Sequence, residues 1–109
     1  MKRVFISQPM NGKTEEEIVN TREKAKNEIA RYYPHEEITV LHSLIQTEPS
    51  EGRNKALWCL SQSLEIMSQA DVVYFAAGWE NARGCRIEHE CAMAYDIARL
   101  AERCGKHEE

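Results

Sequence analysis

The sequence lacks any long apolar run. Its longest uninterrupted stretch of apolar side chains, 72–77, has six residues, whereas a membrane-spanning helix needs about 20. Residues 1–7 lack the apolar segment of a secretory signal, so we expect a cytoplasmic protein without a membrane partner. Positive charge is also scarce. There are 14 Lys and Arg against 18 Asp and Glu, which argues against a partner held through nucleic-acid phosphates.

Cysteine is sparse and shows no pattern of a disulfide framework or a zinc site. The four cysteines are Cys59, Cys85, Cys91 and Cys104, and no two have CxxC spacing, so we expect reduced thiols. Although His89 lies between two of them, the spacing is not that of a zinc site and no fourth ligand is evident. Walker A, GxGxxG, GxSxG and HExxH motifs are absent too. We therefore predict neither a metal nor a cofactor.

What is present is the composition of one small globular domain, 1–109, with 42% hydrophobic and 29% charged residues. Short apolar runs alternate with helical periodicity. The expected strands are 3–7, 38–42 and 71–76, and the expected helices are 14–33, 54–69 and 85–104. Strands separated by helices predict an α/β fold with a parallel sheet and right-handed crossovers.

The first helix has the clearest start and stop signals. Thr14 and Glu17 have the spacing of a capping box, and Pro34 marks the end. Arg22 falls on the stripe expected to be buried. It either meets a carboxylate in the site or at a subunit interface, or it stays solvated because the apolar stripe shifts around the helix axis along its length.

Parallel sheets bind ligands at the carboxyl ends of their strands, which selects the loops 8–13, 42–53 and 77–84. His42, at the end of one strand, is a candidate to protonate a leaving group. Glu88 is expected in the first turn of the last helix. There the helix dipole favours an ionised carboxylate, as a carboxylate nucleophile requires. The alternative is that Glu88 only complements the dipole.

Other side chains in these loops allow two interpretations each. Trp79 is a candidate to stack on a planar ligand group, or else it covers the core or contacts a subunit. Arg83 is a candidate to bind an anionic ligand group, or else it is an ordinary surface residue. The polar side chains of Ser7, Gln8 and Asn11 either bind a ligand or serve the turn.

Three segments together resemble the nucleoside 2-deoxyribosyltransferase-like superfamily. They are Phe-Ile-Ser-Gln-Pro-Met-Asn-Gly at 5–12, Ala-Asp-Val-Val at 70–73, and Gly84-x-x-x-Glu88 followed by Ala92. Gly-Trp at 78–79 and Arg-Gly-Cys-Arg at 83–86 make the chain most similar to its DUF4406 branch.

The resemblance implies a flavodoxin-like three-layer domain with a short parallel sheet of three or four strands in the order 2-1-3. It also implies cleavage or transfer at the N-glycosidic bond of a nucleoside or nucleoside monophosphate. Glu88 would attack the anomeric carbon, and a second base or water would take the sugar, as in retaining glycosyl transfer.

The resemblance and the loop positions together define a candidate site. The expected catalytic residue is Glu88, and the expected substrate-binding residues are Ser7, Gln8, Pro9, Met10, Asn11, Gly12, Trp79, Asn81, Arg83 and Gly84. The expected partner is a small-molecule nucleoside or nucleotide. A homodimer or larger assembly is also expected, because a short sheet exposes its edges and relatives complete their sites across subunits.

The sequence departs from the superfamily pattern at several positions. Phe5 replaces a tyrosine whose hydroxyl holds the catalytic glutamate in relatives, Ser63 replaces an aspartate, and Ala82 replaces a polar residue. Residues 96–103 have a helical pattern where relatives have a last strand, so the sheet is expected to be short. These departures favour the alternative of a non-catalytic nucleotide or small-molecule binding protein. A structural role within an oligomer is a third interpretation.

Overall fold

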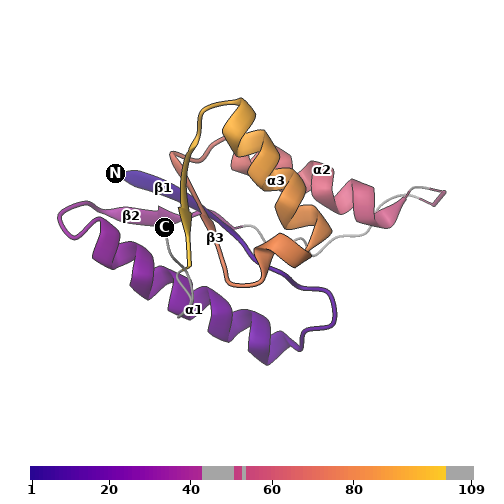
Figure 1. Cartoon of the computed structure of the whole chain (residues 1–109), viewed down its shortest axis with the longest axis horizontal. Coiled ribbons are helices and arrows are strands. Elements are labelled where there is room, and N and C mark those ends of the chain that lie inside the picture. Colours follow the sequence, from indigo (N-terminus) through magenta and orange to yellow (C-terminus); the bar gives the residue numbers. More distant parts are fainter. Residues whose placement is uncertain (43–50, 53, 103–109) are drawn as a thin grey trace.

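The chain forms a three-layer α/β domain, and the computed structural model describes residues 1–42, 51–52 and 54–102. The strands are β1 (Lys2–Ser7), β2 (Ile38–Val40), β3 (Val72–Phe75) and β4 (Ala98–Ala101). The helices are α1 (Glu15–Tyr32), α2 (Lys55–Met67) and α3 (Arg83–Ala94), with a 3-10 turn η1 (Trp79–Asn81). All strands are parallel, in the order β2-β1-β3-β4. Figure 1 shows α1 on one side of the sheet and α2 and α3 on the other. The expected α/β class and strand order are confirmed, and the topology is consistent with a flavodoxin-like fold.

The sheet separates two layers of core side chains, because successive residues of a strand point to opposite faces. Toward α1, Val4 and Ile6 pack with Ile29. Toward α2 and α3, Phe5 and Phe75 belong to a second cluster that contains Met67 and Ala92. All four residues of β3 are buried, as is typical of a central parallel strand. No helix in the described part of the chain is both long and apolar enough to cross a bilayer.

For the last helix, expected over 85–104, the prediction is wrong at both ends. It begins earlier, at Arg83, and ends at Ala94. Asp96 then adopts a left-handed backbone with φ of 59°, and the chain returns as β4 alongside β3. Neither glycine nor proline marks this break. The alanines on both sides of the break keep a helical spacing, so the local sequence predicts that the helix continues. The pairing of β4 with β3 overrides this local preference. Residues 103 and 104 of the expected helix lie outside the described residues.

The start of α1 is confirmed. The Thr14 hydroxyl accepts a hydrogen bond from the Glu17 backbone N–H, and the Glu17 carboxylate accepts one from the Thr14 backbone N–H. Arg22 is partly buried and donates to the Leu41 carbonyl at the end of β2. This contact ties α1 to the edge of the sheet.

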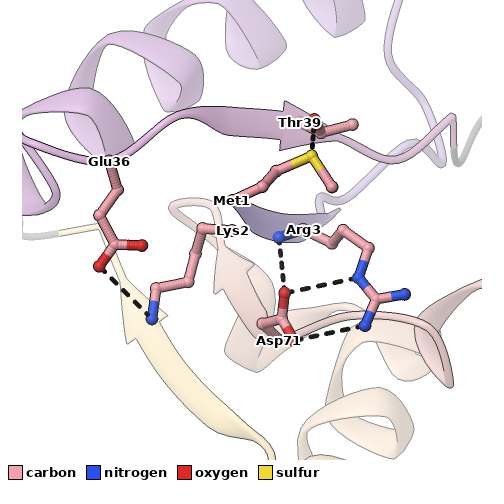
Figure 2. A network of polar contacts seen from close by, with 6 residues as sticks. All are labelled: Met1, Lys2, Arg3, Glu36, Thr39 and Asp71. Atoms are coloured by element: carbon pink, nitrogen blue, oxygen red, sulfur yellow. Dashed lines mark hydrogen bonds and ion pairs between the residues drawn. The ribbon is translucent and has the colours of Figure 1, made fainter.

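Asp71, which belongs to the Ala-Asp segment that carried the family resemblance, joins two strands at their amino ends. Its carboxylate accepts a hydrogen bond from the Arg3 backbone N–H at 2.8 Å and two from the Arg3 guanidinium at 3.5 Å. Figure 2 shows this contact beside the ion pair between Lys2 and Glu36. This edge is opposite to the one where ligands bind in parallel sheets, so the role of Asp71 is structural.

We expect Asp71→Asn to lower the melting temperature at pH 7 and to remove part of the acid sensitivity of the fold. The Arg3 backbone N–H, and then its side chain, hold the pKa of Asp71 below its ordinary value of 3.8. At a pH between the lowered pKa and 3.8, the unfolded chain binds more protons than the folded chain does. The stabilisation is therefore present above pH 3.8 and is lost as the pH falls through the lowered pKa.

The measurement is the melting temperature by circular dichroism between pH 7 and pH 2.5. Asp96→Asn is the matched control, because Asp96 is exposed and asparagine also tolerates its left-handed backbone. An equal difference between Asp71→Asn and the parent at every pH would contradict the linkage.

Candidate functional site

A cleft of about 1070 Å³ opens at the carboxyl ends of β1 and β3. Its walls come from the end of β1 and the following loop, from one face of α2, and from the segment that leads from β3 into α3. This is the edge where a parallel sheet brings its loops and helix amino termini together. The volume is close to the upper limit of small-molecule sites, about 1,000 Å³.

The cleft brings together most of the residues predicted for the site. Those that line it are Ser7, Gln8, Pro9, Met10, Asn11, Asn81, Arg83, Gly84 and Glu88. The other two, Gly12 and Trp79, lie outside its lining. Gly12 has a positive φ of 79° in the turn before α1, a conformation that glycine adopts at little cost.

Trp79 packs against the core. Its ring stacks on His89 with centroids 4.3 Å apart and lies 5.2 Å from the ring of Phe75. His89 in turn meets the edge of Phe75, and burial is the main cause that lowers its pKa. Trp79 thus covers part of the core, as one of its alternatives predicts. This aromatic cluster of Phe75, Trp79 and His89 joins η1 and α3 to the sheet.

Glu88 is buried at the cleft, with 7% of its surface exposed. The Ser7 hydroxyl donates a hydrogen bond of 2.6 Å to its Oε1. Because α3 begins at Arg83, Glu88 lies in the second turn of the helix and not in the expected first turn, so the helix terminus stabilises its charge less. Burial raises the pKa of Glu88, and the Ser7 hydrogen bond opposes that rise. A buried carboxylate with a perturbed pKa in a cleft is typical of a functional group.

Ser7 supplies the hydroxyl that holds Glu88. Residues 5 and 7 lie on the same face of β1, because side chains alternate along a strand. Phe5 packs into the core beside Val73, while Ser7, one step closer to the cleft, reaches Glu88. The sequence identified Ser7 as a ligand contact but missed this partnership. The available signal was the position of Ser7 at the carboxyl end of β1.

Cys85 also lines the cleft, one turn before Glu88. Burial is the main cause that raises the pKa of its thiol to about 11; a hydrogen bond with Ser7 opposes the rise, and the charge of Glu88 adds to it. A thiol with this pKa stays protonated near neutral pH and is a poor nucleophile.

Residues 2–99 match the family model described as "Domain of unknown function (DUF4406)". The chain belongs to the DUF4406 family. A search of curated proteins and a search of solved structures each gave no match. The match covers every described strand and helix except the end of β4.

Two basic residues in the cleft of this DUF4406 protein escaped the sequence analysis. Lys13 and Lys55 line it together with Arg83. Lys55 belongs to α2, so only the folding of α2 over the sheet brings it near the other two. In the described parts of the chain, no three His, Cys, Asp or Glu side chains are placed to hold a metal ion.

The amino terminus of α3 opens on the same cleft. Its cap residue Ala82 offers no side-chain hydrogen bond, and a Cβ added at Gly84 would meet nothing within 4 Å. Backbone N–H groups at a helix start without a side-chain cap are donors for a polar or anionic ligand group. In this DUF4406 domain the cleft thus combines a carboxylate with nearby donors.

Proposed function

We propose that the cleft binds a nucleoside or nucleoside monophosphate and that Glu88 cleaves its N-glycosidic bond. The observation that carries the proposal is the buried Glu88 carboxylate, held by the Ser7 hydroxyl beside a cleft of small-molecule size. The resemblance to the deoxyribosyltransferase-like superfamily supports it. In that superfamily a glutamate at the Glu88 position attacks the anomeric carbon.

The proposed reaction has two displacements. Because Glu88 Oε1 accepts the Ser7 hydrogen bond, Oε2 is the oxygen that attacks the anomeric carbon. The bond to the base nitrogen breaks, its electron pair leaves with the base, and the base takes a proton from water. Water or a second base then attacks the same carbon and releases the carboxylate. Two inversions retain the configuration at that carbon.

Burial and the Ser7 hydrogen bond contribute differently to this chemistry. Burial removes water from the carboxylate, so its charge acts strongly on the positive charge that develops on the sugar. The Ser7 hydroxyl favours the ionised form and fixes the orientation of the carboxylate. In this proposal the sugar and any phosphate are bound by Asn81, Arg83 and residues 8–11, which line the cleft.

A second candidate function is non-catalytic binding of a nucleotide or related small molecule. It is favoured by two side chains that differ from the superfamily pattern. Phe5 offers no hydroxyl and packs in the core, and Ser63 lines the cleft where relatives have an aspartate. Under this alternative the cleft keeps its ligand while the reaction is lost.

The two candidates are separated by assaying ribonucleosides, 2′-deoxynucleosides and their 5′-monophosphates for both binding and base release. We expect a bound compound at 100 times its Kd to stabilise the protein by about 2.7 kcal/mol, seen as a higher melting temperature. We expect chromatography to detect free base from at least one bound compound. Binding without base release would favour the non-catalytic alternative. If no compound bound, both candidates would be rejected.

A further inference from the structure

The cleft is basic although the protein is acidic. Lys13, Lys55 and Arg83 line it, whereas Glu88 is the single acidic residue among the described residues that do so. The chain as a whole has more acidic than basic residues and a net charge of −4. A cleft lined by three cations and one carboxylate is therefore more basic than the average composition of the chain predicts.

The three basic residues lie on three different elements that converge on the cleft. Lys13 precedes the cap of α1, Lys55 is the first residue of α2, and Arg83 is the first residue of α3. Each wall of the cleft thus contributes one cation. A small anion in the cleft would have positive charge on several sides.

These positions are unfavourable for the helices themselves. The amino end of a helix carries partial positive charge and favours acidic side chains there. In α1 three glutamates in the first turn meet this preference, but α2 and α3 begin with a basic residue and have no acid in the first turn. Arg83, a cation placed against its own helix dipole, points to an anionic ligand that offsets the repulsion.

We propose that the cleft selects a nucleotide over a nucleoside, with the phosphate held by Arg83, Lys13 and Lys55. This inference rests on the proposed function, which supplies the nucleoside part of the ligand. The forked guanidinium of Arg83 matches two phosphate oxygens, and the two lysines add compact charge. The phosphate is then part of the specificity of the site.

The test is isothermal titration calorimetry with each of the four common 2′-deoxynucleosides and its 5′-monophosphate. It is done with Glu88→Gln protein so that no turnover interferes. We expect the monophosphate of at least one pair to bind about tenfold or more tightly than its nucleoside, and the difference to shrink as salt is raised. Adding Lys13→Gln and Arg83→Gln together should remove most of that difference.

The matched control is Lys26→Gln with Arg86→Gln, which changes the net charge equally at exposed positions outside the cleft lining. It should leave the preference for the monophosphate intact. Without ligand, Arg83→Gln should melt at the same or a higher temperature, because it removes a cation from a helix amino terminus. A structural role for Arg83 would instead lower that temperature.

Three results would overturn the inference: equal binding of nucleoside and monophosphate, equal weakening by the control pair, or no binding of any monophosphate. Base release is measured separately with the unmodified protein. A phosphate preference without base release would reject only the catalytic function. Base release from nucleosides and monophosphates with equal kcat/KM would reject only the phosphate preference.

Discussion

Glu88→Gln is expected to lower the release of base by several orders of magnitude while the ligand still binds. Glutamine keeps the shape of the side chain and can still accept the Ser7 hydrogen bond, but it has no carboxylate to attack the anomeric carbon. The loss should therefore appear in kcat, with little change in the Kd measured by calorimetry. Single-turnover base release, followed by chromatography, is the direct measurement.

The fold should survive this substitution. Burial raises the pKa of Glu88, so the folded state binds a proton more tightly than the unfolded state does. The buried carboxylate then lowers stability increasingly as the pH rises from its unfolded pKa toward its folded pKa, and by a constant amount above that. Glu88→Gln should thus melt at the same or a higher temperature at pH 7.

Glu90→Gln is the control on the same helix. Glu90 is exposed and lies about 200° around the helix axis from Glu88, so it faces away from the cleft. Its substitution should leave turnover close to that of the parent. Full activity of Glu88→Gln would reject Glu88 as the nucleophile.

The pH dependence of turnover follows from the same carboxylate. Glu88 must be ionised to attack, so the rate should fall as the pH drops through its raised pKa. The Ser7 hydroxyl lowers that pKa, so Ser7→Ala should move the acid side of the rate profile to higher pH. A merely structural role for Ser7 would reduce the rate at every pH without moving the profile.

Much of the fold could be predicted because its signals are local. Strands β1 and β3 are short apolar runs, and the capping box at Thr14 fixes the start of α1. The right-handed crossover of parallel strands then limits the possible sheets to a few. The rule that ligands bind at the carboxyl ends of strands led to the loop that precedes α3, the helix that carries Glu88.

What the sequence did not show depends on contacts between distant segments. The strand β4 has no turn signal before it and exists because β3 offers a free edge. The bond between Ser7 and Glu88 joins residues 81 positions apart, and Lys55 reaches the cleft only because α2 packs over the sheet. The expected homodimer stays a prediction, which the mass of the protein by light scattering tests.

Phe75→Ala is expected to cause the largest loss of stability among single substitutions near the site. The Phe75 side chain is fully buried in the core layer between the sheet and helices α2 and α3. Truncation of a buried phenylalanine costs about 3–5 kcal/mol, because the transfer free energy is lost and a cavity remains. The whole free energy of unfolding of such a domain is only about 5–15 kcal/mol.

The measurement is urea unfolding at 25 °C, followed by circular dichroism and compared at constant m value. Tyr95→Ala is the control, since it removes an aromatic ring that is 79% exposed and should change stability by less than about 0.5 kcal/mol. Phe75→Leu refills most of the cavity and should fall between the two. Equal losses for Phe75→Ala and Tyr95→Ala would contradict the burial described for Phe75.

The effect should extend to the site, because Phe75 supports the segment that carries Glu88. Its ring contacts both Trp79 in η1 and His89, the residue next to Glu88. Without the ring, η1 and the middle of α3 lose their shared contact with the sheet, and the 2.6 Å bond between Ser7 and Glu88 loses its support. Base release by the folded fraction of Phe75→Ala should therefore fall, and Phe75→Leu should restore both stability and rate in part. A normal rate per folded molecule would show that the Ser7 and Glu88 pair is held by α3 alone.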